Sequence, residues 1–339
     1  MLPVPSPTVP PVSTLPSLSP GQAEEVRTLG RRAADADGVA ALSEQTLLSL
    51  AAPEGAVEHV LAYAAGHLGA YAQCQPAGGG GGGSDGADGG SPGDGEGPSV
   101  ELVVDPALRR QGLGSAVWAA VEARDPRARV WAHGDLPSAR GFAAALGLEP
   151  VRELHKMARP LTEADATGEA AGAATALPAG FSARTFVPGQ DEEAWLETNA
   201  AAFARHPEQG RLTLADLRER MDQPWFDPAG FIVVEADEAP GRVAAFHWTK
   251  VDPEQRSTSD PAATAGEVYV VGVHPAYQGR GLARPLTALG LAHLAGLGLP
   301  EVVLYVDGDN TGALRTYSSL GFRDIMVDVM YSRAVHARV

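Results

Sequence analysis

The sequence predicts an α/β fold that is built twice in tandem within 339 residues. Two observations lead to this prediction. The order strand, loop, helix, strand, helix, strand occurs in residues 99–160 and again in residues 267–333, and such alternation is typical of α/β domains. An Ala/Gly/Thr-rich segment, residues 162–180, separates the two occurrences as a linker does. We therefore expect a Pro/Ser-rich disordered tail and two domains joined by a linker, with these ranges: tail 1–20, first domain 21–160, linker 161–180, second domain 181–339.

The elements of the first domain follow from periodicity and from glycine and proline signals. Helical periodicity runs through residues 24–50, where Ser43 is a candidate helix cap. A glycine-rich tract, residues 78–97, cannot bury enough apolar surface to fold, and we expect a flexible loop between strands. The remaining predicted elements are a strand pair in 57–73, strands at 100–105 and 129–135, helices at 115–124 and 138–148, and a closing segment at 151–161.

The second domain repeats this order. The predicted helices cover residues 191–206, 214–223, 284–298 and 310–322. The predicted strands cover residues 230–237, 241–252, 267–273, 301–309 and 323–333. Residues 253–266 have the composition of an inserted loop, which a connection between elements tolerates at small entropic cost.

The two copies can be aligned residue by residue. Arg109 and Gln278 are 169 residues apart, and the same offset aligns Gly112 with Gly281. Further along, Gly147 and Gly321 align at an offset of 174. A drift of five residues is an ordinary difference in loop length, so the alignment indicates a duplicated unit.

Composition excludes several classes of function. The formal net charge is −16, with no basic stripe, so nucleic acid is an unexpected partner. Cys74 is the single cysteine, which rules out an internal disulfide and a thiolate-built metal site, and we expect no metal. No apolar run reaches the roughly 18–20 residues of a membrane span. The N-terminus lacks a basic segment before its apolar residues, so the sequence predicts a cytoplasmic protein.

Both copies carry a glycine loop between a strand and a helix. The pattern is Arg109-x-x-Gly112-x-Gly114 in the first copy and Gln278-x-x-Gly281-x-Ala283 in the second. Backbone N–H groups at a helix N-terminus form an anion site, and small residues let a pyrophosphate approach. Neither copy has the Gly-Lys-Ser/Thr of a Walker loop or the spacing of a dinucleotide fold. A plain strand-to-helix turn without ligand is the alternative, and it is less favoured because the loop occurs twice in one register.

These loops, with "EVYVVGVHPAYQGRGLA" and "DGDNTGALRTYSSLGF", resemble motifs A and B of the GNAT superfamily of acetyl-CoA-dependent N-acetyltransferases. The blocks "HPEQG", "PWFDP", "FHWTK" and "LYVDGDN" resemble the mycothiol synthase family in particular, over roughly residues 24–333. The resemblance implies two tandem GNAT domains, each a mixed, mostly antiparallel central sheet flanked by helices. It implies a monomeric enzyme that transfers acetyl from acetyl-CoA to the cysteinyl amine of Cys-GlcN-Ins, a small thiol pseudo-disaccharide, giving mycothiol and CoA.

The alignment of the copies predicts which one is catalytic. Acyl transfer to an amine needs a proton acceptor and a donor for the departing thiolate. Glu267, the implied general base, aligns with Pro98 at offset 169, and Tyr317, the implied acid, aligns with Ala143 at offset 174. We therefore expect the first domain to bind a CoA-type ligand at most, and the second to perform the reaction. Without the family match, Glu267 would read as a surface glutamate and Tyr317 as a packed helix tyrosine.

The resemblance also implies the binding residues. The acceptor pocket comprises Glu44, Glu208, Lys250, Glu267 and Tyr305. The acetyl-CoA site of the second domain comprises Val271, Gly272, Val273, Gln278, Gly279, Arg280, Gly281, Leu282, Ala283, Arg284, Asn310, Thr311, Gly312, Ala313, Leu314 and Arg315. A second acetyl-CoA site in the first domain comprises Glu101, Leu102, Val103, Arg109, Arg110, Gln111, Gly112, Leu113 and Gly114.

Two other functions stay open at this point. One is a tandem GNAT enzyme that acetylates another amine, such as an aminoglycoside, a polyamine or a protein N-terminus. The other is a non-catalytic acetyl-CoA sensor, which would have lost Glu267 and Tyr317 in both copies. The second copy retains both residues.

Overall fold

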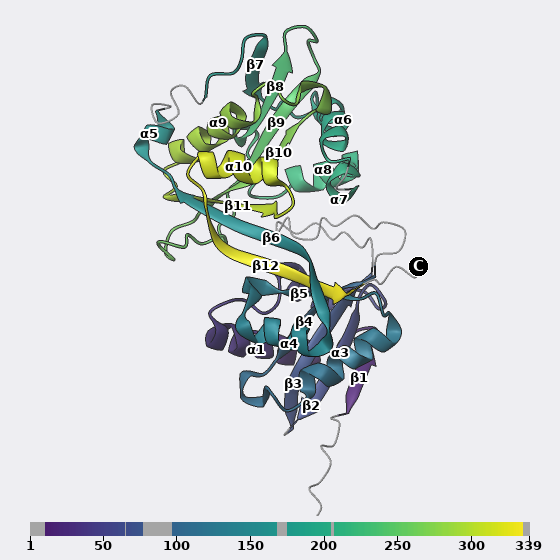
Figure 1. The fold of residues 1–339 in the computed structure, drawn as a ribbon. Coiled ribbons are helices and arrows are strands. Elements are labelled where there is room, and N and C mark those ends of the chain that lie inside the picture. The colour runs from purple at the N-terminus through teal and green to yellow at the C-terminus, as the bar shows by residue number, and fades with distance from the viewer. Residues whose placement is uncertain (1–10, 65, 77–96, 168–174, 205–206, 335–339) are drawn as a thin grey trace, which may run out of the picture. The chain divides into compact units, whose positions relative to one another are not determined.

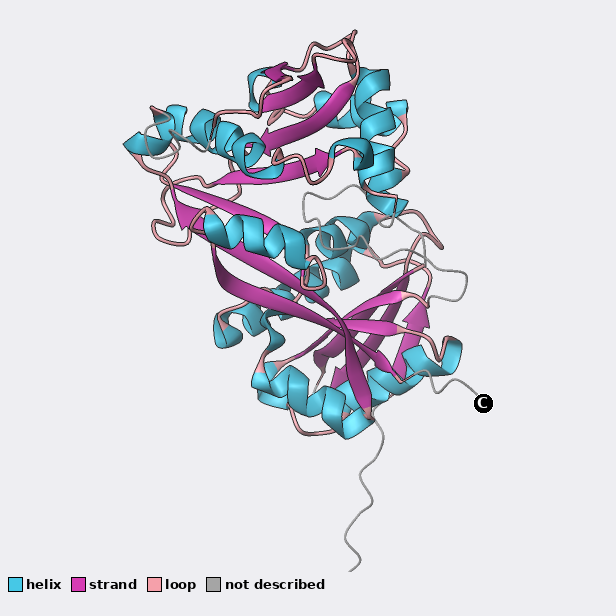
Figure 2. Ribbon diagram, turned by 45° about the horizontal axis from the view of Figure 1, so that its top comes forward, coloured by secondary structure: helices cyan, strands magenta, loops and turns pink. Residues whose placement is uncertain are grey.

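The computed structural model describes residues 11–64, 66–76, 97–167, 175–204 and 207–334, and Figures 1 and 2 show its ribbon. The described chain forms two compact units. Unit 1 contains the described residues up to Leu154 together with the C-terminal stretch that begins at Val327. Unit 2 runs from His155 to Met326. Almost all of the glycine-rich tract at 78–97 lies outside the described residues.

Unit 1 is a mixed, mostly antiparallel sheet with helices on both faces. Its strands follow the order β1-β2-β3-β4-β5-β12, in which β4 and β5 are the parallel pair. The elements are β1 (Val12–Leu15), α1 (Pro20–Asp37), α2 (Glu44–Leu48), β2 (Glu58–Ala64), β3 (His67–Gln75), β4 (Ser99–Val104), α3 (Leu113–Arg124), β5 (Arg129–Ala132), α4 (Pro137–Leu146), β6 (Leu148–Pro160) and β12 (Arg323–Arg333).

Alternation along the strands of unit 1 supplies two hydrophobic clusters. On β3, Ala70 and Ala72 belong to a cluster with Val117 and Trp118 of α3. Tyr71, which points to the other face, belongs to a cluster with the buried residues of α1. Because successive side chains of a strand point to opposite faces, one strand serves both layers.

Unit 2 has the corresponding architecture. Its strand order is β6-β11-β10-β9-β8-β7, with β10 and β11 as the parallel pair. The elements are α5 (Glu163–Ala166), β7 (Phe181–Thr185), α6 (Glu192–Ala202), α7 (Pro207–Gly210), α8 (Leu214–Met221), β8 (Phe231–Ala236), β9 (Val243–Lys250), β10 (Gly266–Val273), α9 (Ala283–Gly296), β11 (Glu301–Asp307) and α10 (Thr311–Ser319). The side chains of α9 and α10 pack in one cluster, and those of α6 and α8 pack in another with Trp248.

Most of the predicted elements are confirmed, including the helix that Ser43 caps through its side chain. The predicted disordered tail is wrong for residues 12–15, which form β1 and pair with β2. Val12 packs against the core beside α3, and this contact gives a short Pro-flanked segment enough apolar burial to order. β7 is a further strand, directly after the expected linker, that periodicity did not indicate.

The last strand of each repeat is exchanged between the units. β12, at the end of the second repeat, pairs with β5 of unit 1, with Val329 opposite Ala132. β6, at the end of the first repeat, is the strand beside β11 in unit 2. Compact units and sequence repeats therefore divide this chain differently, and the repeat boundaries drawn from the sequence stay a prediction.

Candidate active site

The candidate base Glu267 lies at the start of β10, directly opposite Lys250 at the end of β9. Both residues are buried, with 4% of Glu267 and 2% of Lys250 exposed. Register partners in an antiparallel pair share one face of the sheet, with Cβ atoms about 4.5–5.5 Å apart. A carboxylate and an ammonium are thus brought together inside unit 2, as the predicted acceptor pocket requires.

Three residues that the sequence did not single out surround Lys250. Its Nζ lies 3.1 Å from a carboxylate oxygen of Asp252. The same atom lies 5.2 Å from the ring centre of Trp225 and 6.0 Å from that of Tyr269. Trp225 stands in the block "PWFDP", and Asp252 follows the block "FHWTK", so those blocks were the signal that could have identified them. One carboxylate and two aromatic rings therefore surround the Lys250 ammonium beside Glu267.

A β-bulge in β10 corrects the predicted alignment of the two copies. The ladder between β10 and β9 shifts between Val268 and Val270, so Tyr269 is an extra residue. The ladder between β4 and β3 has no such shift across Ser99–Val104. Counted along the ladders, the residue of the first copy that corresponds to Glu267 is therefore Ser99. The sequence offset had aligned Glu267 with Pro98, and this alignment is wrong by one residue. The conclusion drawn from the alignment is unaffected, because serine is not a carboxylate base.

The strand edge predicted to bind acetyl-CoA is free of its parallel neighbour. The ladder between β10 and β11 ends at Glu267 opposite Val303, whereas β10 continues to Val273. Over Val271–Val273 the antiparallel ladder to β9 persists. On the opposite edge, the described ladder to β11 does not extend to these residues, and the Val273 carbonyl there accepts a hydrogen bond from the Gln278 side chain. Gly272 has a packing role as well, since an added Cβ would lie 2.6 Å from the Phe246 ring.

The glycine loop of unit 2 turns directly into α9. Gly279 and Gly281 adopt left-handed φ angles of 76° and 82°, which residues with a Cβ rarely accept. The Gln278 side chain donates a 3.1 Å hydrogen bond to the Val273 carbonyl and so anchors the loop to the strand. Leu282, at the helix N-cap, makes no side-chain capping bond. The first N–H groups of α9, from Ala283 on, thus have no side-chain cap, as the predicted anion site requires.

The cationic side chains of this loop are exposed. Arg280 makes an ion pair of 3.2 Å with Glu238, and its guanidinium lies 5.0 Å from the ring centre of Tyr277. Arg284, on the first turn of α9, is exposed. Both side chains lie at the surface of the loop that the sequence predicts to hold the pyrophosphate.

The helix α10 carries the candidate acid. The Asn310 side chain caps it by accepting a 3.1 Å hydrogen bond from the Ala313 N–H, and Thr311, Gly312, Leu314 and Arg315 form its first turns. Tyr317 packs with the cluster beneath α9 and lies edge-on to Phe322, with ring centres 5.7 Å apart. Burial raises the pKa of Tyr317 to about 12. The phenol is therefore protonated at neutral pH and can donate.

For the other predicted acceptor residues, the structure shows fewer contacts. Tyr305 lies on β11, with the Lys156 ammonium 5.2 Å from its ring centre. Glu44 begins α2 of unit 1 and Glu208 lies in α7, but the side chains of both fall outside the described residues. The geometry brings Glu267 and Lys250 together and leaves Glu44 and Glu208 as predictions.

Unit 1 contains a cavity of about 310 Å³ at its own glycine loop. The ladder between β4 and β5 ends at Glu101 opposite Trp131, and the cavity opens where the two strands part. Its wall contains residues of the predicted second acetyl-CoA site, namely Leu102, Val103, Arg109, Arg110, Gly112, Leu113 and Gly114. The first copy therefore has a cavity at the place where the second acetyl-CoA site was predicted.

The loop of unit 1 has the same anchor as the loop of unit 2. Arg109 donates from Nε to the Val104 carbonyl at 3.4 Å, which matches the contact from Gln278 to Val273 at offset 169. Arg109 differs in that its guanidinium also forms two bonds of 2.7 and 2.6 Å with Asp37. Hydrogen bonding to Asp37 raises the pKa of Arg109. Gln111 bonds its own loop, at the Ala107 carbonyl.

Glu101 has a structural environment that the sequence did not indicate. It accepts a 2.8 Å hydrogen bond from the Ser43 N–H and lies 3.3 Å from Nε2 of His133. Nδ1 of the same imidazole lies 3.1 Å from Asp328 of β12. Burial opposes ionisation of His133, but the charges of Glu101 and Asp328 outweigh it and raise the pKa of His133 to about 10. This carboxylate–imidazolium–carboxylate cluster fastens β12 to β4 and β5.

The helices that follow β5 and β11 differ where chemistry would occur. Leu136 precedes α4 without a side-chain cap, whereas Asn310 caps α10. Ala143 of α4 aligns with Tyr317 of α10. Unit 1 thus has the cavity and the loop, but it has neither of the residue types that the sequence predicts to transfer protons.

Comparison with known proteins agrees with this geometry. The profile of the acetyltransferase (GNAT) family matches residues 191–322. A mycothiol acetyltransferase of Thermobispora bispora is 46% identical over 93% of this chain and 97% of its own length. One from Thermomonospora curvata is 48% identical over 93% of this chain and 94% of its own. The chain belongs to the mycothiol acetyltransferase family.

Solved structures show the same fold. A GCN5-related N-acetyltransferase from Sphaerobacter thermophilus superposes with a TM-score of 0.66 at 23% identity, over 94% of each chain. A tandem GNAT protein from the clavulanic acid biosynthesis pathway gives 0.61 at 19% identity, over 95% of this chain and 98% of that one. The predicted architecture of two tandem GNAT domains is confirmed.

Membership of this family makes the chain an acyltransferase with acetyl-CoA as its acetyl donor. Within the described ranges, no helix is both long and apolar enough to cross a membrane. The same residues contain no group of three His, Cys, Asp or Glu side chains arranged to hold a metal ion.

Proposed function

We propose that this enzyme transfers the acetyl group of acetyl-CoA to the cysteinyl amine of Cys-GlcN-Ins, giving mycothiol and CoA, and that unit 2 performs the reaction. The relatives that are 44–48% identical over nearly the whole chain are named mycothiol acetyltransferases. The observation that carries the proposal is the position of Glu267. It is buried opposite Lys250 at the last rung of the β10–β11 ladder, where the cofactor-binding edge begins.

Glu267 acts as the general base. It takes a proton from the amine, directly or through one water, and the freed lone pair attacks the thioester carbonyl. A carbon–nitrogen bond forms and the carbon–sulfur bond breaks. N–H groups along the free edge of β10, at Val271–Val273, bind the oxygen on which negative charge develops.

Tyr317 acts as the general acid. Its burial raises its pKa to about 12, so it carries its proton at working pH and donates it to the departing CoA thiolate. The helix N-terminus of α9 and the left-handed glycines before it hold the pyrophosphate. Asn310 and the first turns of α10 flank the pantetheine arm.

The acceptor lies against the caged ammonium of Lys250. Trp225 and Tyr269 flank Lys250, and aromatic faces suit the C–H faces of sugar and inositol rings. Tyr305 and Glu208 belong to this pocket by family resemblance, and the role of Glu44 stays a prediction of that resemblance. A monomeric state and a cytoplasmic location likewise stay predictions from the sequence.

Unit 1, in this proposal, binds an acyl-CoA without transferring its acyl group. The cavity between β4 and β5 and the anchored loop at Gly112 support binding. Ser99 and Ala143, which stand where unit 2 has Glu267 and Tyr317, provide neither base nor acid. The first copy then binds the ligand without catalysis, and the bound ligand has at most a structural role.

The test is mass spectrometry of products after the purified chain is offered acetyl-CoA with Cys-GlcN-Ins or with a panel of aminoglycosides and polyamines. We expect one added acetyl group on the cysteinyl nitrogen of Cys-GlcN-Ins and little product from the panel. Faster acetylation of a panel amine would replace the proposed acceptor, and binding of acetyl-CoA without any product would favour the sensor.

A further inference from the structure

An arginine from the exchanged strand reaches the C-terminal end of the helix that follows β5 or β11 in each unit. In unit 2, Nη1 of Arg159, on β6, donates a 2.8 Å hydrogen bond to the carbonyl of Leu320, just after α10. In unit 1, Nη1 of Arg333, on β12, donates a 3.2 Å hydrogen bond to the carbonyl of Leu146, the last residue of α4. Both arginines and both leucines align at the offset of 174. The same arginine-to-carbonyl hydrogen bond therefore occurs in both repeats.

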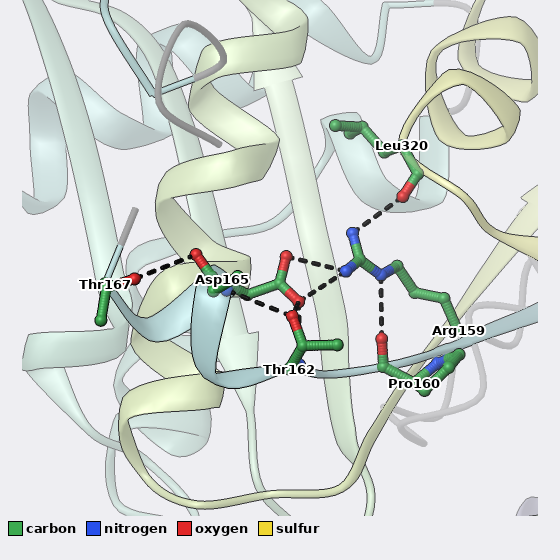
Figure 3. A network of polar contacts seen from close by, with 7 residues as sticks. Arg159, Pro160, Thr162, Asp165, Thr167 and Leu320 are labelled. Carbon is green, nitrogen blue, oxygen red and sulfur yellow. Dashed lines mark hydrogen bonds and ion pairs between the residues drawn. The ribbon is translucent and has the colours of Figure 1, made fainter. Parts of the chain in front are cut away.

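Figure 3 shows how Arg159 is held in unit 2. Its Nη2 lies 2.7 and 2.6 Å from the two carboxylate oxygens of Asp165. Asp165 also accepts hydrogen bonds from the N–H and hydroxyl of Thr162, at 2.9 and 2.8 Å. The side chains of Arg159 and Asp165 are 14% and 5% exposed. A guanidinium clamped on one side by a buried carboxylate has little freedom, so its other side fixes the Leu320 carbonyl.

The Leu320 carbonyl belongs to the turn that carries Tyr317. The Tyr317 carbonyl accepts hydrogen bonds from the N–H groups of Leu320, at 3.0 Å, and Phe322, at 3.1 Å. The Tyr317 ring packs edge-on against Phe322. A cation at a helix C-terminus also stabilises its last carbonyls. The direction in which Tyr317 points is thus tied to the position of Arg159.

We propose that Arg159 is a positioning residue for Tyr317: clamped by Asp165, it fixes the C-terminal turn of α10 so that the phenol reaches the sulfur of the departing thiolate. This inference rests on the proposed role of Tyr317 as general acid. The residue comes from the first repeat and acts on a helix of the second. Arg333 makes the reciprocal contact on α4, where Ala143 replaces the tyrosine, so it has no proton donor to position.

The experiment compares Arg159→Met with the matched control Arg333→Met and with Tyr317→Phe. We expect Arg159→Met to lower kcat by about 10–100-fold, with the KM values of both substrates nearly unchanged. The double variant Arg159→Met/Tyr317→Phe should be no slower than Tyr317→Phe alone, because both act through one group. Arg333→Met should lower the melting temperature while kcat stays within about twofold of wild type.

A second readout separates positioning from general damage. An acetyl thioester of an acidic aryl thiol releases a thiolate that needs no proton, so the defects of Arg159→Met and Tyr317→Phe should both shrink with this donor. Should Arg159→Met fail to fold, Arg159→Lys replaces it, because a single ammonium cannot reproduce the fork that joins Asp165 to Leu320.

The outcomes distinguish the positioning role of Arg159 from the acid role of Tyr317. Multiplicative effects in the double variant, or an equal loss of kcat in Arg333→Met, would overturn the positioning role while Tyr317 remained the acid. Wild-type turnover by Tyr317→Phe would instead overturn the proposed acid, and this inference with it.

Discussion

Glu267 and Lys250 are direct partners across the β9–β10 ladder, and both are almost fully buried. The ammonium is held by Asp252 and two aromatic rings, so it remains beside the carboxylate without a ligand. Removing one partner of a buried ion pair is costly, and the ion-pair partner of this ammonium is Asp252. Glu267 itself lies at the last rung of the parallel ladder, where β10 begins to run without β11, and this is the position at which the proposed amine deprotonation needs a base.

We predict that Glu267→Gln lowers turnover at neutral pH by about 10²–10⁴-fold, which is the usual contribution of a general base. The amide keeps the shape and the hydrogen-bonding capacity, so acetyl-CoA should still bind. Steady-state rates beside calorimetric titration of acetyl-CoA measure both properties. Glu254→Gln, at an exposed position nearby, is the control. Turnover of Glu267→Gln within a few-fold of wild type would remove Glu267 from the mechanism.

The two glycine loops should respond differently to the same change. Gly112 and Gly281 have φ angles of 86° and 82°, so alanine is similarly strained at each. Gly281→Ala should weaken acetyl-CoA binding and raise its KM, because the loop precedes the anion site of α9. Gly112→Ala should remove acyl-CoA from unit 1 and leave turnover nearly intact.

Acetyl-CoA stoichiometry by calorimetry, measured with the rates of both variants, checks this pair. If Gly112→Ala abolished turnover while the protein stayed folded and unit 2 stayed loaded, the division into a binding copy and a catalytic copy would be wrong.

The stability of unit 2 should depend on close packing between α9 and β9. A Cβ added at Gly290 would lie 2.0 Å from the ring of His247. We expect Gly290→Ala to destabilise the protein by about 1–3 kcal/mol, as overpacking does. A Cβ added at Gly296, on the last turn of α9, would meet no atom within 4 Å. Gly296→Ala should therefore stabilise the protein by about 0.5–1 kcal/mol. Denaturant melts measure both, and equal effects of the two substitutions would contradict the packing argument.

The His133 cluster should make unit 1 less stable at high pH. The folded-state pKa of His133 is raised to about 10 from an ordinary value of 6.5. The folded state therefore binds this proton more tightly than the unfolded state. Its stabilisation is complete below the ordinary value and is lost as the pH rises through the folded value. Between pH 7 and 10 the wild type should lose more stability than His133→Gln.

Thermal melts across this range, with amide exchange at β5 and β12, test the cluster. Lysine and tyrosine titration affects both proteins alike, so the difference between them isolates His133. Identical pH slopes would show that the cluster contributes nothing in the folded state.

The candidate site could be predicted from the sequence wherever it rests on local signals. The glycine loops were found because the same glycine spacing occurs twice between a strand and a helix. The structure adds that Gly281 adopts a left-handed φ, which residues with a Cβ rarely accept. The roles of Glu267 and Tyr317 came from family resemblance. They remain predictions, although the structure buries Glu267 and partly buries Tyr317. Trp225 and Asp252 were missed because each acts only through Lys250, which is brought beside them by folding.

By itself, the sequence determined the local elements and the duplication, because helix and strand periods, caps and glycine turns depend on neighbouring residues. Ser43 at its helix cap and Gly147 aligned with Gly321 are of this kind. Only the tertiary structure decided the bulge at Tyr269, which moved the partner of Glu267 from Pro98 to Ser99. It also decided the strand exchange that places Arg159 on Leu320. The bulge depends on how β10 pairs with β9, and the exchange depends on pairing between segments more than a hundred residues apart. In both cases many alternatives share the same periodicity, and packing energy selects one.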